Sequence, residues 1–439
     1  MPSVLIAGGG LVGSVNACFF GQKGWKVTVF ESRPDPRGKS LQPGKSFNLA
    51  LGCRALDTLE RIGLKEKVIE MGVAIREKIR YDGEKEEAVL EKLQGLKEGD
   101  FVLTINRQQL SELLINEAEN YNNVEFLFNH KATKIDAASQ KLHIEKSDGS
   151  SLTVDGDLIL ACDGAHSSIR RSLLKVPGFD FNQKYCEIGY MDLSAEVQNM
   201  DGFKLGVHYS WRKEGVILVA LANRNGILTV SMFARFEVFE RIQEDPVGFF
   251  AANFAPVHST IGGAHILATI TKNKPQAIIS LQCSQHGFFD KLLLMGDAAH
   301  AMVPFQGQGA NCGFEDCVVL QEILEEYEDV KDVVREYSKL RTMDTNVMNQ
   351  MEWEGYLQLF QLLKHPKQSS GWFLAFTSSL KSHFPGFFPS TFTRAMFSRE
   401  RYSEIAKRNK KNRKFINTTV KIILIFGIPL IFAIIIFEF

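Results

Sequence analysis

Residues 3–14 read SVLIAGGGLVGS, and this stretch decides the fold. Its first five residues are apolar after the leading serine and predict a short buried strand. The strand leads directly into GGGLVG, in which Gly8, Gly10 and Gly13 fit the pattern G-x-G-x-x-G. Residues 14–22 then predict a helix. A strand that runs through this glycine pattern into a helix is typical of a dinucleotide-binding α/β fold.

Each of the three glycines has its own physical task in such a turn. Gly8 makes the tight turn, Gly10 lets the backbone approach a pyrophosphate, and Gly13 lets the helix pack closely against the strand. A second strand is predicted over residues 26–30, and Glu31 follows it. A carboxylate here accepts hydrogen bonds from ribose hydroxyls and disfavours a 2′-phosphate, so the pattern favours FAD or NAD over NADP.

Composition sets the class of protein. The 439 residues are 45% hydrophobic and 23% charged, which is typical of a globular chain with more than one domain. Lys+Arg and Asp+Glu both number 51, so we expect no nucleic-acid partner. The seven cysteines are an odd number without a C-x-x-C pair, which favours reduced thiols over disulfides or a zinc site, and no metal is expected.

The end of the chain has a different character. Residues 422–437 read IILIFGIPLIFAIIIF without a charge, and residues 407–414 contain six cations. An apolar run beside a basic segment is typical of a transmembrane helix with a cytoplasmic flank. We therefore predict a membrane anchor over residues 416–437 in the lipid bilayer of the mitochondrial outer membrane, with the endoplasmic reticulum as the alternative. The catalytic part would face the cytosol, and a buried C-terminal helix is the other interpretation.

Two further motifs follow predicted buried strands. Residues 157–162 lead into DGAHSSIR, which begins at Asp163, and residues 291–295 lead into GDAAH, which contains Asp297. With the first motif, these resemble the FAD-dependent aromatic hydroxylases, whose signatures are G-x-G-x-x-G, D-G-x-x-S-x-x-R and G-D-A-A-H-x-x-x-P. All three occur here in that order.

The resemblance implies how the cofactors bind. Asp297 is expected to contact the flavin ribityl chain, residues 307–311 to open a helix that faces the ring, and Asp163 to lie near FAD and take part in NADPH binding. The other FAD contacts that it implies are Val12, Ser32, Ala50, Arg107, Ala132, Gly309, Ala310 and Asn311.

The resemblance also implies an activity, the NADPH- and O2-dependent hydroxylation of a small aromatic amino-acid metabolite. NADPH would reduce FAD, and O2 would then form a flavin C4a-hydroperoxide that attacks the ring. No side chain is assigned as a catalytic group, because the flavin carries this chemistry. We interpret His300, in GDAAH, as a structural or flavin-adjacent histidine.

The resemblance implies that an arginine and a tyrosine bind a substrate carboxylate, and here the arginine position carries Lys78. The tyrosine position falls near Gln94, where the sequence has none. Tyr402 and Asn349 are the other implied substrate contacts, with Gly355 competing for the place of Asn349. A lysine lacks the bidentate geometry of arginine. Three alternatives therefore stay open: a hydroxylase with an altered anchor, a related flavin monooxygenase with another aromatic substrate, and a flavin-bound membrane protein without efficient hydroxylation.

The predicted fold class is α/β. It comprises a Rossmann-type FAD-binding domain, an antiparallel sheet domain on the substrate side, a C-terminal helical segment and one transmembrane helix. The predicted boundaries are 1–71, 104–175 and 281–343 for the FAD-binding domain, 72–103 and 176–280 for the sheet domain, 344–406 for the helical segment, 407–414 for the basic run and 416–437 for the anchor. Within the sheet domain, strands are predicted over residues 215–222 and 226–233.

Overall fold

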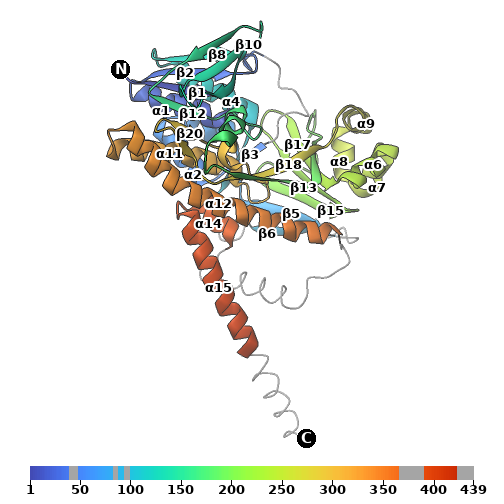
Figure 1. Ribbon diagram of the computed structural model, residues 1–439. Coiled ribbons are helices and arrows are strands. Elements are labelled where there is room, and N and C mark those ends of the chain that lie inside the picture. Colours follow the sequence, from blue (N-terminus) through green and yellow to red (C-terminus); the bar gives the residue numbers. More distant parts are fainter. Residues whose placement is uncertain (39–47, 83–87, 93–98, 365–389, 423–439) are drawn as a thin grey trace.

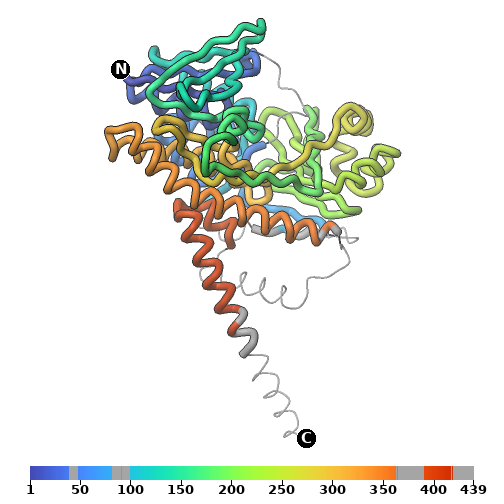
Figure 2. The backbone as a smooth tube through the Cα atoms, viewed as in Figure 1, coloured from blue at the N-terminus to red at the C-terminus, as the bar shows by residue number. Residues whose placement is uncertain are grey.

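The computed structural model describes residues 1–38, 48–82, 88–92, 99–364 and 390–422. This part of the chain forms two units, each built on a β-sheet, and the long helix α12 (Val330–Lys364) runs from one to the other (Figure 1). The C-terminal helix α15 (Tyr402–Ile422) projects away from both units (Figure 2).

The first unit is a six-stranded sheet of the dinucleotide-binding type. Its strands β1, β2, β8, β12 and β20 are parallel, and only the edge strand β19 is antiparallel. The sheet order is β19 (Gly287–Phe288), β20 (Leu292–Leu294), β12 (Leu158–Ala161), β1 (Ser3–Ala7), β2 (Lys26–Glu31) and β8 (Val124–Phe128). The predicted strand, glycine turn and helix at the N-terminus are confirmed, with the helix α1 (Leu11–Gln22) starting three residues earlier than expected.

Both faces of this sheet are covered, as a parallel sheet requires. Val4 and Ile6 of β1 point into a core shared with α1, α4 (Arg107–Glu119) and α11 (Gln308–Glu326). Leu5 and Ala7, which alternate with them along the strand, point to the opposite face and into a second core. That second core is closed by an antiparallel sheet of β9 (His130–Ile135), β10 (Leu142–Lys146) and β11 (Ser151–Val154), with α5 (Ser168–Ser172) and the 3-10 helix Leu173–Lys175.

A small three-stranded sheet joins the two units. It has the order β3 (Asn48–Leu51), β7 (Val102–Asn106) and β4 (Val73–Ile75), and α2 (Cys53–Arg61) and α3 (Lys65–Met71) connect β3 to β4. The predicted sheet domain began at residue 72, but β4 pairs with β7 rather than with the large sheet.

The second unit contains the large sheet. Its order is β18 (Gln276–Cys283), β13 (Phe181–Asp192), β17 (Ile227–Arg235), β16 (Val216–Ala222), β15 (Val207–Lys213), β5 (Glu77–Asp82) and β6 (Ala88–Lys92), and β14 (Ala195–Glu196) also pairs with β17. The two predicted strands are confirmed as β16 and β17. The sheet is antiparallel as predicted except at one junction, where β15 and β5 run parallel.

Helices cover one face of the large sheet. They are α6 (Phe236–Glu244), α7 (Pro246–Asn253), α8 (Ala255–Ile261) and α9 (Gly263–Lys272), which lie together at the edge of the molecule in Figure 1. Their apolar residues form one core with alternate residues of β15, β16 and β17. The sequence prediction treated residues 176–280 as a sheet domain and did not place helices there.

The C-terminal region is helical, with α14 (Thr391–Phe397) preceding α15. The predicted boundary between residues 343 and 344 falls inside α12, which continues without a break. The basic run 407–414 lies in α15. The predicted anchor lies mainly in residues 423–439, outside the described residues, and among the described helices none combines the length and apolar character needed to cross a membrane.

Candidate active site

The glycine turn has the packing that the sequence predicted. Gly8 has a φ of +101°, and a Cβ atom there would lie 2.4 Å from the carbonyl oxygen of Cys162. A Cβ at Gly13 would lie 1.9 Å from the carbonyl oxygen of Gly8, so α1 packs against the turn only without a side chain. A Cβ at Gly10 would meet no protein atom within 4 Å. Packing within the protein therefore does not require a glycine at position 10, which fits a place where a ligand approaches the backbone.

Val12 is the point where separate motifs meet. A Cβ at Gly296 would lie 2.9 Å from Val12 Cγ2, and a Cβ at Gly313 would lie 2.7 Å from the same atom. The GDAAH motif and α11 are thus packed against the first turn of α1. Asp297, which begins α10 (Asp297–His300), is exposed, whereas Ala298 is buried. The carboxylate of Asp297 is therefore accessible beside the glycine turn.

Glu31 is held at the end of β2 beside this turn. Its Oε2 accepts a hydrogen bond from the Gly9 N–H at 2.9 Å, and its Oε1 accepts one from Arg33 Nε at 2.8 Å. The Ser32 hydroxyl lies 3.3 Å from Oε1. Burial raises the pKa of Glu31, but the hydrogen bonds and charge of Arg33 outweigh it, so the net shift is downward. The group is a fixed carboxylate at the position that predicts ribose binding.

The first turn of α11 is the second helix N-terminus in this region. Its N-cap Gly307 has a φ of +68° and makes no side-chain cap, and a Cβ at Gly309 would meet no atom within 4 Å. The Gln308 N–H of this turn donates to Glu352 Oε1, and the N–H groups that follow it carry the positive end of the helix dipole. Ala50 lies close by, since a Cβ at Gly307 would be 3.5 Å from its Cβ.

Asn311 fixes this turn with its side chain. Its Nδ2 donates to the carbonyl oxygens of Ala50 at 2.8 Å and Gly307 at 2.7 Å, and its Oδ1 accepts from the Gly52 N–H at 2.8 Å. Both amide hydrogens are thus used within the protein. The predicted cofactor contact at Asn311 would therefore be made by its backbone and by the backbone of Ala310.

Asp163 lies next to Gly8, where a Cβ would approach the Asp163 Cα to 3.0 Å. Its Oδ2 accepts from the N–H groups of Ser168 at 2.7 Å and Ile169 at 3.2 Å. Its Oδ1 is buried and has no hydrogen-bond partner among the described residues. Burial raises the pKa of Asp163 against these hydrogen bonds. A buried acceptor of this kind fits a hydroxyl donor supplied by a ligand.

Two of the predicted FAD contacts have different environments. Arg107 is the first residue of α4 and is exposed, directly after Asn106, whose side chain caps the helix. Ala132, on β9, has its side chain in the core between the two sheets.

Tyr402 and Glu352 are joined through Gln308, the first residue of α11. The buried Tyr402 hydroxyl donates to Gln308 Oε1 at 3.1 Å, and the Gln308 N–H donates to Glu352 Oε1 at 3.2 Å. Glu352 Oε2 accepts from the Gln306 N–H at 2.8 Å. Burial raises the pKa of Glu352 to about 8, in spite of these hydrogen bonds.

Sequence reasoning missed Glu352. The signal that was available is its place three residues after Asn349, within a predicted helix, between Met351 and Trp353. An acid on the same helix face as a predicted substrate contact indicates a buried polar site.

Asn349 is fully engaged inside the protein. Its Nδ2 donates to the carbonyl oxygens of Leu281 at 2.7 Å and Ala301 at 2.8 Å, and its Oδ1 accepts from Ser280 Oγ at 2.6 Å. These bonds tie α12 to β18 and to the chain after α10. Neither amide hydrogen of Asn349 is left for the substrate contact that the resemblance implies.

Lys78 comes from a different element, the strand β5. It is in register with His208 on β15 and with Glu91 on β6. The tyrosine position near Gln94 lies outside the described residues.

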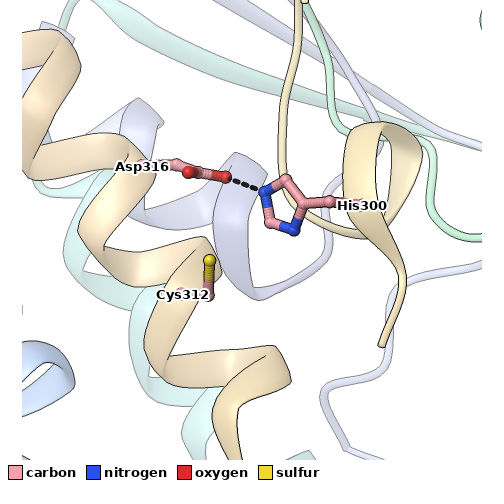
Figure 3. A group of neighbouring side chains, drawn as sticks. All are labelled: His300, Cys312 and Asp316. Carbon is pink, nitrogen blue, oxygen red and sulfur yellow. Dashed lines mark hydrogen bonds and ion pairs between the residues drawn. The ribbon is translucent and has the colours of Figure 1, made fainter. Parts of the chain in front are cut away.

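His300 belongs to a buried network of charges. Its Nε2 lies 2.6 Å from Asp316 Oδ2, and Arg341 Nε donates to Asp316 Oδ1 at 2.8 Å. Figure 3 shows His300 facing Asp316 and Cys312, which both lie on α11, and the possible ligand atoms of the three lie within 4.8 Å of one another. Burial raises the pKa of Asp316, but the charges of His300 and Arg341 outweigh it and lower the pKa strongly.

The cation beside this group is an arginine. Arg341 Nη2 lies 3.3 Å from Cys312 Sγ, and Arg341 Nη1 donates to Glu315 at 2.9 Å, which also pairs with Arg54. The guanidinium thus already provides the positive charge that the carboxylates need. This geometry favours the structural interpretation of His300.

Comparison with known proteins agrees with this geometry. Residues 1–343 match the family model described as an FAD binding domain. A kynurenine 3-monooxygenase of Caenorhabditis elegans is 40% identical over 438 residues, covering 95% of this chain and 94% of its relative. A kynurenine 3-monooxygenase of Sus scrofa is 34% identical over 427 residues, covering 95% and 88%.

Solved structures share the fold. The tetrameric form of 2-methyl-3-hydroxypyridine-5-carboxylic acid oxygenase matches with a TM-score of 0.68 at 21% identity, covering 83% of this chain and 93% of that one. CtdE in complex with FAD and a substrate matches with a TM-score of 0.67 at 17% identity, covering 96% and 100%. At these identities the likeness concerns the fold alone.

The fold and the site together define an FAD-dependent monooxygenase of the aromatic hydroxylase class. The uncapped N-terminus of α1, the exposed Asp297 and an Asp163 oxygen without a hydrogen-bond partner among the described residues all fit FAD as its cofactor. More narrowly, the chain belongs to the kynurenine 3-monooxygenase family.

Proposed function

We propose that the protein uses NADPH and O2 to hydroxylate L-kynurenine to 3-hydroxy-L-kynurenine. The observation that carries the proposal is that the GDAAH motif and α11 both pack against Val12 of the glycine turn, in a chain that follows its family over 95% of its length. Bound FAD, once reduced, would supply the chemistry that activates O2 and transfers one oxygen atom to the ring.

The chain's own residues would hold the cofactor along one line. The glycine turn and the N-terminus of α1 would face the pyrophosphate, and Glu31 would accept from the adenosine ribose. Asp297 would bind the ribityl chain. The N–H groups at the start of α11 would stabilise negative charge that develops on the flavin ring.

Aromatic side chains close the site on the substrate side. The rings of Phe233 and Phe305 have centroids 5.8 Å apart, and Phe305 and Tyr356 have centroids 6.0 Å apart. Phe305 directly precedes the loop whose backbone Glu352 binds. These rings would bind an aromatic substrate and exclude water, which otherwise diverts reduced flavin and O2 to peroxide.

The assay uses FAD-loaded protein with NADPH and L-kynurenine, following NADPH loss, H2O2 and 3-hydroxykynurenine together. We expect kynurenine to stimulate NADPH oxidation and to yield stoichiometric 3-hydroxykynurenine. Stimulation with peroxide alone would instead support a poorly coupled relative. No stimulation, with FAD still bound, would refute kynurenine as the substrate and favour another aromatic compound or no turnover.

We also propose that residues 416–437 attach the protein to the mitochondrial outer membrane, or alternatively to the endoplasmic reticulum, with the catalytic part in the cytosol. The six cations of residues 407–414, just before this run, support the proposal. Alkaline carbonate extraction of fractionated organelles tests it. Release of the full chain into the supernatant would contradict the proposal, and a chain ending at residue 415 serves as the released control.

A further inference from the structure

The two faces of the large sheet differ in chemistry. On β15, Val207, Tyr209 and Trp211 point into the core under α6 to α9. His208 and Ser210 alternate with these residues along the strand and therefore point to the other face of the sheet. That second face is not sealed by the helical layer.

The second face is turned toward the predicted flavin loop. On the neighbouring strand β16, Leu221 pairs with His208 and Val219 pairs with Ser210. Leu221 and Val219 pack in one cluster with Ala50 of β3. Ala50 in turn lies beside Gly307, at the start of α11. His208 and Ser210 are therefore in the row next to residues that reach the cofactor side.

Two side-chain atoms in this row, one of Ser210 and one of His208, lack a hydrogen-bond partner in the described part of the chain. The Oγ of Ser210, a residue only 9% exposed, is buried without a hydrogen bond among the described residues. The same holds for the Nδ1 of His208. Buried polar groups in native proteins are nearly always paired, and an exception calls for a functional explanation.

Two cations lie in this row. Lys78 on β5 is in register with His208 and Arg80 with Ser210, and because paired residues point to the same side of a sheet, these side chains share one face. Burial, followed by the charge of Lys78, lowers the pKa of His208 to about 4. At neutral pH the imidazole is thus an uncharged group with one N–H donor beside a positive charge.

We propose that Lys78, His208 and Ser210 together bind the carboxylate of the aromatic substrate, so that a lysine and two neutral donors do the work of one bidentate arginine. This inference rests on the proposed function and adds His208 and Ser210 to the site. Lys78 supplies charge from one strand, while His208 and Ser210 supply hydrogen bonds from the next, which a carboxylate can accept at both oxygens.

The test separates the carboxylate from the rest of the ligand. Dissociation constants of L-kynurenine and of its decarboxylated analogue, kynuramine, are measured from the change in flavin fluorescence of the FAD-loaded full chain. We expect His208→Leu to weaken L-kynurenine by about 10- to 100-fold and kynuramine by less than about threefold. Ser210→Ala should act in the same direction with a smaller factor.

Two controls guard against a structural effect. His208→Gln keeps a neutral donor and should restore most of the affinity for L-kynurenine. His258→Leu removes a matched histidine from α8, in the helical layer on the opposite face, and should leave both dissociation constants unchanged. FAD content and the melting temperature show that each variant is folded.

The outcomes are distinct. Equal weakening of both ligands by His208→Leu, or no weakening of either, would overturn the carboxylate anchor. If the wild type binds L-kynurenine with the expected dependence on His208 but does not hydroxylate it, the anchor stands and the proposed function fails. If the wild type does not bind L-kynurenine at all, both are refuted.

Discussion

Replacing Glu352 by glutamine should change how stability depends on pH. The pKa of this buried carboxyl rises from 4.5 to about 8 on folding, because burial disfavours its charged form. Below pH 4.5 the group is protonated in both states and has no effect. Above that pH the unfolded chain ionises first, so the folded state loses about 1.4 kcal/mol for each pH unit until its own pKa is reached.

Between pH 5.5 and 8.5 this loss amounts to about 3 kcal/mol. Glutamine does not ionise, so the variant does not lose this stability as the pH rises. The variant has a separate cost of about 1–3 kcal/mol at every pH, because its amide NH2 faces one of the backbone N–H groups of Gln306 and Gln308 that a carboxylate accepts. The two effects separate because only the first depends on pH.

The assay is urea unfolding of the FAD-loaded protein at pH 5.5, 7 and 8.5, followed by tryptophan fluorescence. The free energy of unfolding of Glu352→Gln should rise relative to wild type by about 3 kcal/mol from the lowest to the highest pH. Glu354→Gln, on the exposed side of the same helix, should stay within about 0.5 kcal/mol of wild type throughout. Parallel curves for wild type and Glu352→Gln would refute the reasoning.

Further predictions concern the cofactor turn and the charged core. Gly13→Ala should yield little folded protein, since its Cβ would collide with the carbonyl of Gly8. Gly10→Ala should instead keep the melting temperature of the FAD-free protein. It should lower FAD affinity, measured by fluorescence titration, by about tenfold or more. Equal behaviour of the two variants would contradict this. Asn311→Ala should reduce the free energy of urea unfolding by about 3 kcal/mol, because it leaves buried backbone groups unpaired. Asp316→Asn should cost about 3–5 kcal/mol in the same measurement, since it removes one of the two carboxylates that pair with the buried Arg341, and a loss below about 1 kcal/mol would argue against that pairing.

The parts of the fold that sequence predicted well are those with a strong local pattern. The strand β1, the glycine turn and the helix α1 are specified by neighbouring residues, and so are β16 and β17. The boundary placed at residue 344 was wrong as a break between elements, because the helical pattern continues through it and α12 is a single helix.

Less of the candidate site than of the fold could be predicted from the sequence. Lys78 and His208 are 130 positions apart and become neighbours only through the parallel pairing of β5 and β15. No local pattern encodes such a register. Asn349 illustrates the converse, because a side chain with the expected polarity is taken up by backbone partners that only the folded chain provides.

The unbroken course of α12 has a mechanical consequence. Its first turns pack through Tyr337 in the core of the nucleotide unit, its middle carries Glu352, and further along the Tyr356 hydroxyl accepts the Glu187 N–H of the large sheet. At 1.5 Å per residue the helix is about 50 Å long, and an uninterrupted helix resists bending. One continuous helix therefore connects the two units. Any rotation of the large sheet relative to the nucleotide unit must also move the loop at Gln306, which Glu352 binds.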